Sequence, residues 1–220
     1  FAPKAIAGGV VAVVTDAAGV SMLEGTEGFA LLEVADPRAF AGLAAAHVYG
    51  NPGESMSVIG ITGTNGKTTT AHFVHHVLSQ MSGPTLLIGT VGVSLGDTHV
   101  SSARTSLEAP VLHRVLAWAL KRGAKNVVME VSSHALSLHR VAGMKFDVCA
   151  FLNLQRDHLD FHKTMESYFE AKASLFDGCL SKRAVICVDD EWGEQLAQMV
   201  RIPTVTVSTN SEADWHVISH

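Results

Sequence analysis

The sequence predicts an α/β fold in which a mainly parallel, P-loop-containing sheet has helices on both faces, joined to part of a smaller N-terminal α/β domain. From about residue 57 onward, short apolar runs that suit buried strands alternate with segments of helical spacing. Such alternation implies a parallel sheet covered on both faces. A glycine-rich loop joins one strand to a helix, and polar clusters follow two further strands, where ligands bind in folds of this class.

The N-terminal quarter is predicted to form a small unit of its own. We expect a helix end, two strands and an alanine-rich helix with proline in its first turn, at residues 4–9, 10–14, 29–34 and 37–49. Asn51, Pro52 and Gly53 then break the chain. This break predicts a domain boundary, with a partial N-terminal domain over residues 1–53 and a central domain over residues 54–220.

The elements of the central domain follow from the same alternation. Strands are expected at residues 57–62, 85–89, 126–131, 147–152, 184–188 and 203–207. Helices are expected at residues 67–81, 109–122, 164–177 and 190–200. Between Gly89 and Ser106 the chain is rich in glycine and serine, which predicts a loop.

Composition argues against several classes of protein. The chain of 220 residues is 47% hydrophobic and 17% charged, as globular domains are and disordered chains are not. Its net charge is −5 and it has no basic stripe, which argues against nucleic acid or a membrane surface as a partner. The apolar run over residues 5–14 is too short to span a bilayer.

Cysteine usage and the chain ends add three expectations. Cys149, Cys179 and Cys187 form no Cys-x-x-Cys pair, and Cys149 and Cys187 lie in strand-like apolar runs, which indicates reduced core residues of a cytoplasmic protein. The sequence has no coiled-coil or repeat pattern, so a monomer is expected. The chain opens on Phe1 instead of methionine and stops without a turn signal, so we expect a fragment of a longer chain.

The segment from Gly60 to Thr70 (GITGTNGKTTT) is the most informative feature. It lies between a strand-like run and a helical one, which is the arrangement of a phosphate-binding P-loop. Glycines let backbone N–H groups surround phosphate oxygens, Lys67 would reach the terminal phosphates, and the Thr68 hydroxyl would bind Mg²⁺. The strict pattern has glycine where Ile61 stands, and a glycine-rich turn without a ligand is the alternative.

A first polar cluster follows the strand expected at 126–131. Glu130 lies near the end of this apolar strand, and a buried carboxylate needs a partner such as Mg²⁺. Capping of the next helix is the alternative for Glu130. Ser132, Ser133 and His134 come next and suit the binding of polar substrate groups or, equally, a helix N-cap.

A second cluster, NLQRDHLDFH at residues 153–162, also follows a strand. His158 and His162 lie four residues apart, which suggests zinc, but the His-Glu-x-x-His order is missing. A solvated histidine is the ordinary alternative, and the position after a strand favours a function. Further on, Lys172 lies in an amphipathic segment, where the residues alone predict a solvated or snorkelling side chain.

Five motifs in this order resemble those of the Mur ligases, most closely the MurE type, which adds the third residue of the stem peptide. They are GTNGKTT at 63–69, TSxE at 105–108, MEVSSH at 129–134 with Arg140 after it, NLxRDHLDxH at 153–162 and YxxAK at 168–172. The resemblance covers about residues 55–200. It implies ATP and Mg²⁺ as cofactors.

The resemblance also implies roles for single residues. The ATP phosphates would be held by Gly63, Thr64, Asn65, Gly66, Lys67, Thr68 and Thr69. Thr68 and Glu130 would bind one Mg²⁺ and His158 a second. Lys172 matches a lysine that CO₂ converts to a metal-binding carbamate, so the implied catalytic residues are Lys67, Glu130, His158 and Lys172. The UDP-muramoyl-dipeptide substrate would be bound by Thr105, Ser106, Ser132 and Arg140.

The implied activity is ATP-dependent amide ligation in the cytoplasm, during peptidoglycan synthesis. The γ-phosphate would pass to the D-glutamyl carboxylate of UDP-N-acetylmuramoyl-L-alanyl-D-glutamate, and an amine of meso-diaminopimelate or L-lysine would attack the acyl phosphate. Residues 1–53 would be part of a UDP-substrate-binding domain, and residues 54–220 an incomplete ATP-binding domain. The C-terminal domain that selects the amino acid would be absent, so we expect this chain alone to be inactive.

Departures from the family pattern and three rival functions remain open. Arg104, Leu138 and Cys187 differ from residues common in relatives, which leaves their contacts undecided. A folylpolyglutamate synthetase-like enzyme would share the P-loop and metal residues. A P-loop kinase or GTPase is a second rival, although the Asn-Lys-x-Asp motif of GTPases is missing. A nucleotide-binding module without catalysis is the third.

Overall fold

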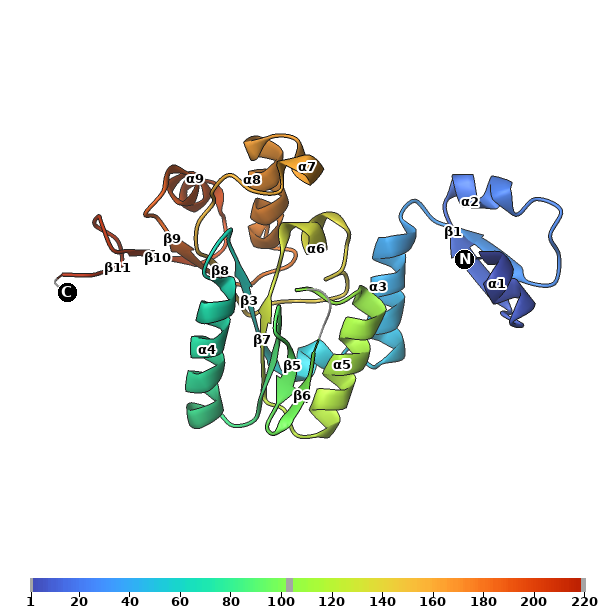
Figure 1. Ribbon diagram of the computed structural model, residues 1–220, viewed down its shortest axis with the longest axis horizontal. Coiled ribbons are helices and arrows are strands. Elements are labelled where there is room, and N and C mark those ends of the chain that lie inside the picture. The colour runs from blue at the N-terminus through green and yellow to red at the C-terminus, as the bar shows by residue number, and fades with distance from the viewer. Residues whose placement is uncertain (1, 102–104, 219–220) are drawn as a thin grey trace.

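Figure 1 shows the computed structural model, which describes residues 2–101 and 105–218. Within these residues the main sheet has nine strands in the order β11-β10-β9-β8-β3-β7-β4-β5-β6. Neighbouring strands run parallel except at β4-β5 and β5-β6, which are antiparallel. The prediction of a mainly parallel α/β sheet is therefore confirmed.

The strands of this sheet are β3 (Ser57–Thr62), β4 (Thr85–Gly89), β5 (Gly92–Leu95), β6 (Thr98–Val100), β7 (Asn126–Glu130), β8 (Val148–Phe151), β9 (Ala184–Cys187), β10 (Thr204–Ser208) and β11 (Trp215–His216). The helices around it are α4 (Lys67–Met81), α5 (Ala109–Lys121), α6 (Ser133–Ser137), α7 (Leu159–His162), α8 (Met165–Ala173), the 3₁₀ turn η2 (Ser174–Phe176) and α9 (Glu191–Met199).

Helices cover both faces of the sheet, because successive strand residues point to opposite sides. On β7, Val128 packs with Ala71 of α4 in the smaller apolar cluster. Its neighbours Val127 and Met129 join the larger core, which includes Leu116 of α5. Figure 1 shows α4 and α5 on the two sides of the central strands. The expected two-sided cover is therefore confirmed.

The N-terminal part consists of α1 (Ala2–Ala7), β1 (Ala12–Thr15), α2 (Ala17–Met22), β2 (Ala30–Glu33) and α3 (Pro37–Val48), followed by the 3₁₀ turn η1 (Pro52–Ser55). Helix α3 packs against α5 of the main sheet's cover. Strands β1 and β2 pair in parallel. Asp36 caps α3 by accepting hydrogen bonds from the N–H groups of Arg38 and Ala39. The domain boundary after residue 53 stays a prediction.

Several element predictions were wrong. The loop expected between Gly89 and Ser106 contains the antiparallel hairpin β5-β6, whose buried residues Val93 and Leu95 were hidden among glycines and serines. The helix expected at 164–177 ends earlier, since α8 gives way to the tighter turn η2. The short helices α2 and α7 were not predicted, because a helix of one or two turns is stabilised by tertiary packing.

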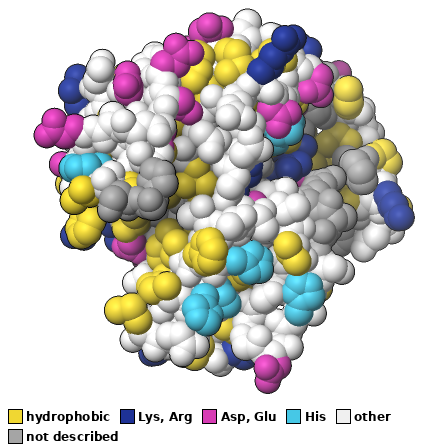
Figure 2. Space-filling model, turned by 60° about the vertical axis from the view of Figure 1, so that its left-hand side comes forward, with side chains coloured by type: hydrophobic (Ala, Val, Ile, Leu, Met, Phe, Trp, Pro, Cys, Tyr) yellow, Lys and Arg dark blue, Asp and Glu magenta, His cyan; other side chains and the backbone are white. Residues whose placement is uncertain are grey.

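The surface mixes side chains of every kind. In Figure 2 the α4 side of the molecule comes forward, and hydrophobic and histidine side chains lie at the surface in its lower half. On α4 the exposed large apolar residues are Phe73, Val77 and Met81. Among residues 2–101 and 105–218, no helix has the length and apolar character needed to cross a membrane.

Candidate functional site

The candidate site lies at the carboxyl ends of three neighbouring strands, β8, β3 and β7. Register places Ile61 of β3 beside Glu130 of β7, and Thr62 of β3 beside Phe151 of β8. The glycine-rich loop (residues 63–66) follows β3, Ser132 follows β7, and residues 153–162 follow β8. The three motifs therefore meet at one edge, as predicted for a parallel sheet.

The glycine-rich loop turns directly into α4. Gly66 caps this helix with φ +82, a left-handed conformation that glycine adopts at little cost. The Nζ of Lys67 donates hydrogen bonds of 2.8 Å to the carbonyl oxygens of both Gly63 and Thr64. Burial lowers the pKa of Lys67, and the negative charge of Glu130 opposes that shift. The lysine thus lies over the loop, with its ammonium on backbone oxygens.

The segment after β8 holds the loop from the other side. The Oδ1 of Asn153 accepts hydrogen bonds from the N–H groups of Thr64 (3.1 Å) and Asn65 (2.9 Å). The hydroxyl of Thr64 lies 3.2 Å from the hydroxyl of Tyr168, and the amide of Asn65 donates to Gln155 Oε1. Sequence reasoning gave Asn153 and Tyr168 no role. In the sequence, only their positions inside the motifs that resemble those of the Mur ligases indicated a function for these two residues.

Glu130 is 1% exposed, and its carboxylate faces α4. The hydroxyl of Thr68 lies 3.0 Å from both carboxylate oxygens, and Thr90 donates its backbone N–H (2.8 Å) and its hydroxyl (3.2 Å). A side chain at Gly89 would collide with the Glu130 carboxylate. Thr90 and Gly89 were not predicted as site residues, because neither carries a charge or a motif signal.

The alternatives for Glu130 and Ser132 can now be decided. The N-cap of α6 is Ser132, whose hydroxyl oxygen accepts a hydrogen bond of 3.1 Å from the N–H of Ala135. Capping by Glu130 is therefore wrong, and capping by Ser132 is confirmed. Since Glu130 forms no ion pair with a Lys or Arg among the described residues, its buried carboxylate fits a bound cation.

Lys172 is 1% exposed, so the predicted solvated or snorkelling side chain is wrong. Its Nζ donates a 2.9 Å hydrogen bond to the carbonyl of Gly63 and lies 4.7 Å from the ring centroid of Tyr168. Burial lowers the pKa of Lys172 to about 7, and the positive charge of Lys67 adds to this shift. Tertiary packing of α8 under the glycine-rich loop, which no sequence period reports, explains the burial.

Histidines and aromatic rings surround this lysine. The His158 ring lies 4.8 Å from the His134 ring and 5.9 Å from the Tyr168 ring, centroid to centroid. His162 is buried, and its Nε2 lies 2.9 Å from the hydroxyl oxygen of Ser133. Burial lowers the pKa values of His134 and His162. Across the described residues no group of three His, Cys, Asp or Glu side chains is placed to hold a metal, so nothing supports the zinc hypothesis.

The predicted substrate residues form two groups. Three hydroxyls gather beside Glu130. Thr105 lies 3.1 Å from the Thr90 hydroxyl, and Ser106 lies 3.2 Å from the Ser132 hydroxyl. Arg140 instead forms an ion pair of 3.0 Å with Glu108, in a geometry that is not a hydrogen bond.

Arg38 of α3 contacts the same carboxylate of Glu108 at 3.4 Å. Glu108 is therefore a further residue that sequence reasoning left without a role, although it closes the TSxE motif. Of the departures, Leu138 is the C-cap of α6, and Cys187 is the last residue of β9. Arg104 lies outside the described residues.

The mainly parallel sheet, with the candidate site at the carboxyl ends of its strands, is the α/β domain that solved structures of Mur ligases and folylpolyglutamate synthases share. A folylpolyglutamate synthase from Mycobacterium tuberculosis, solved with ADP, matches 80% of this chain and 48% of its own, with a TM-score of 0.63 at 15% identity. A solved UDP-N-acetylmuramoyl-L-alanyl-D-glutamate–2,6-diaminopimelate ligase matches 89% of this chain and 41% of its own, with a TM-score of 0.78 at 30% identity.

The family description "Mur ligase middle domain" matches residues 61–219, and the chain belongs to the Mur ligase family. A protein of Corynebacterium glutamicum named UDP-N-acetylmuramoyl-L-alanyl-D-glutamate–2,6-diaminopimelate ligase is 45% identical over an alignment of 220 residues that covers 98% of this chain. A protein of the same name from Aquifex aeolicus is 44% identical over 173 residues, 79% of this chain. The chain spans 42% of the length of the Corynebacterium relative and 36% of that of the Aquifex relative.

Proposed function

We propose that the protein containing this chain is an ATP-dependent amide ligase that adds meso-diaminopimelate to UDP-N-acetylmuramoyl-L-alanyl-D-glutamate in peptidoglycan synthesis. The observation that carries the proposal is the buried Lys172, held against the carbonyl of Gly63 with a pKa of about 7. A phosphate-binding loop alone would serve a kinase equally well. Relatives named as diaminopimelate ligases favour that amine over L-lysine.

The residues on the β7 side fit a divalent cation. Thr68 and Glu130 would hold one Mg²⁺, because a buried carboxylate and a hydroxyl are the hard oxygen donors that Mg²⁺ prefers. When bound, Mg²⁺ supplies positive charge that offsets the repulsion between phosphate and carboxylate. His158 and the carbamate of Lys172 would hold a second ion on the β8 side.

The carbamate follows from the low pKa of Lys172. Near pH 7 a large share of its amines would be neutral, and only the neutral amine is a nucleophile. Nitrogen would bond to the carbon of CO₂, one C–O electron pair would move to oxygen, and the nitrogen would lose a proton to solvent. The product is a carbamate with a negative charge, whereas the unmodified lysine side chain is either neutral or positively charged.

The ligation itself uses the groups around the glycine-rich loop. The Lys67 ammonium would exchange the carbonyls of Gly63 and Thr64 for phosphate oxygens. The substrate carboxylate would attack the γ-phosphorus of ATP and release ADP. The amine would then attack the acyl carbon, and phosphate would leave. Thr105, Ser106 and Ser132 would bind polar groups of the UDP-linked substrate, and Arg140 an anionic one.

The remaining proposals concern the whole protein. Residues 1–53 would be part of the UDP-substrate-binding domain, and residues 54–220 part of the ATP-binding domain, with the amino-acid-selecting domain elsewhere. The site of action would be the cytoplasm, where cysteines such as the free Cys149, Cys179 and Cys187 stay reduced. A monomer is proposed, and the molar mass in solution would test it.

Phosphate release by the full-length protein tests the function. Reactions contain ATP, Mg²⁺ and the UDP-muramoyl-dipeptide, with meso-diaminopimelate or L-lysine supplied separately. We expect release with diaminopimelate, lost in Lys67→Ala and kept in the surface control Lys121→Ala. Phosphate release with L-lysine but not with meso-diaminopimelate would show that L-lysine is the amine that the enzyme adds. Silence with both amines in a protein that still binds ATP would contradict the proposal and favour a folylpolyglutamate synthase-like acceptor.

A further inference from the structure

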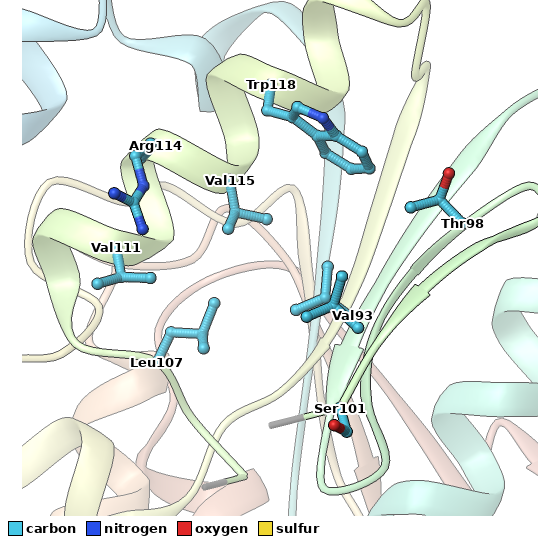
Figure 3. A pocket seen from close by; sticks show the side chains of 9 residues that line it. Val93, Thr98, Ser101, Leu107, Val111, Arg114, Val115 and Trp118 are labelled. Carbon is cyan, nitrogen blue, oxygen red and sulfur yellow. The ribbon is translucent and has the colours of Figure 1, made fainter. Parts of the chain in front are cut away.

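A cavity of about 240 Å³ lies between helix α5 and the hairpin β5-β6. Its walls are mainly apolar and come from Val93, Leu107, Val111, Val115 and Trp118. Figure 3 shows these side chains around the space between α5 and the hairpin. Four of them, Val93, Leu107, Val115 and Trp118, belong to or pack against the main core. The walls are therefore held by the fold.

The rim of the cavity is apolar and open to solvent on one side. Val100, which also lines it, is 60% exposed, and Val111 is 37% exposed. Exposed apolar side chains around a hollow favour an apolar occupant, because its entry removes their surface from water. The volume lies below the 300–1,000 Å³ or so of sites for drug-sized ligands, so the occupant must be small.

Of the described residues that line this apolar space, one is a cation. Arg114 of α5 lines the cavity and has no ion-pair partner among the described residues. A guanidinium prefers a carboxylate, which can accept two parallel hydrogen bonds from it. The hydroxyls of Thr98 and Ser101 add two polar groups to the lining. A few polar groups on an otherwise apolar wall are typical of small-molecule sites.

We propose that this cavity binds a small amphipathic monocarboxylate, with its apolar body against Trp118 and Val115 and its carboxylate on Arg114. The flat ring of Trp118 and the neighbouring valines suit an aromatic or branched body. Binding does not depend on the proposed ligase function, since none of these residues belongs to the candidate site.

Indole-3-acetate is the probe, with the neutral indole-3-acetamide as its matched analogue. Ligand-detected NMR titration of the full-length protein measures both affinities. We expect the acid to bind about tenfold more tightly than the amide, and Arg114→Gln to remove that preference. Lys121→Gln removes a charge from the same helix outside the cavity and should change nothing.

Filling the cavity gives a second, independent test. Val115→Phe should abolish binding of the acid, whereas Val77→Phe, on the exposed side of α4, should not. Circular dichroism shows whether each variant is folded. The proposal is overturned by equal affinity for acid and amide in the wild type, by binding that persists in folded Val115→Phe, or by the lack of saturable binding at millimolar probe.

A consequence for catalysis rests on the proposed function. Leu107, in the cavity wall, is next to Ser106 in the sequence. The hydroxyl of Ser106 donates a 3.4 Å hydrogen bond to the backbone carbonyl of Glu130 and lies 3.2 Å from the hydroxyl of Ser132. An occupant should therefore raise the KM for the UDP-linked substrate and leave kcat unchanged. An unchanged KM at saturating probe would refute this coupling. Absence of ligase activity would refute the proposed function instead, and the NMR titration would still decide the binding.

Discussion

The two halves of the candidate site differ in charge. On the β7 side, Glu130 supplies a carboxylate that is already in contact with Thr68 and Thr90. On the β8 side, Lys172 and His158 supply an amine and an imidazole, and Glu130 is the only Asp or Glu among the buried described residues. One half can thus attract a cation with the side chains that the gene encodes. In the other half the carboxylate of Asp157, which lies 3.5 Å from His158, is exposed, so this half gains a buried anion only after its lysine has changed charge.

Removing the encoded carboxylate should have the largest effect. Glu130→Gln keeps the shape of the side chain and loses its charge, so phosphate release should fall about 10³-fold. Glu194→Gln, an exposed change on α9, serves as the control. A rate near that of the wild type would show that this carboxylate takes no part, and the contrast between the halves would disappear.

Removing the lysine tests the other half. Lys172→Met keeps the length and apolar stem and loses the amine, so phosphate release should fall about 100-fold. The wild type should also lose activity in CO₂-depleted buffer and regain it with bicarbonate, whereas the variant should respond to neither. A wild type indifferent to CO₂ would contradict the carbamate.

The same variant should be more stable in acid. Burial lowers the pKa of Lys172 from 10.5 to about 7, so the unfolded chain binds the proton more tightly than the folded one. The resulting penalty is complete below about pH 7 and shrinks as the pH rises toward 10.5. In CO₂-free buffer Lys172→Met should unfold at a higher temperature than the wild type at about pH 6, by the equivalent of a few kcal/mol.

That advantage should narrow as the pH rises toward about 10, because the folded lysine is then neutral and the unfolded one begins to lose its proton as well. Thermal unfolding followed by circular dichroism measures it, with the exposed Lys121→Met as control. If the difference in unfolding temperature between the variant and the wild type were the same at every pH, protonation of Lys172 would not contribute to the difference in stability.

Loosening the loop between the two halves should have a smaller effect. Asn153→Ala removes the acceptor of the N–H groups of Thr64 and Asn65, so the KM for ATP should rise about tenfold. Initial rates at varied ATP measure this, and the exposed Asn210→Ala is the control. A lower KM would show instead that the Asn153 amide competes with phosphate for these N–H groups.

The smallest effect is expected where only one hydrogen bond to Glu130 is lost. Thr90→Val removes a hydroxyl at 3.2 Å and keeps the backbone N–H at 2.8 Å, so the Mg²⁺ concentration for half-maximal rate should rise about threefold. Thr26→Val, an exposed change outside both sites, is the matched control. An unchanged Mg²⁺ requirement would leave the backbone N–H as the group that orients the carboxylate.

Sequence reasoning predicted the first half of the site better than the second. The limits of β3, α4 and β4 agree with the predicted ones, because a buried strand, a glycine loop and an amphipathic helix each leave a local pattern. Glu130 was recognised for a similar reason, since a carboxylate inside an apolar strand is conspicuous.

The second half depends on contacts between distant residues. Lys172 is buried because α8 packs under a loop more than a hundred positions earlier, with Nζ on the carbonyl of Gly63. Asn153 reaches back to Thr64 in the same way. The hairpin β5-β6 was missed because its few apolar residues lie among glycines and serines. None of these pairings leaves a period in the sequence.

Gly89 has a consequence for how this region tolerates mutation. Its backbone is ordinary, unlike that of Gly66, so nothing in its conformation demands glycine. The space that a methyl group would need at position 89 is filled by the Glu130 carboxylate. If every amino acid is tested at position 89, each replacement of glycine should therefore reduce activity about as much as a mutation of Glu130 does. Gly89 has no side chain of its own, yet its tolerance to mutation would reveal the position of the Glu130 carboxylate.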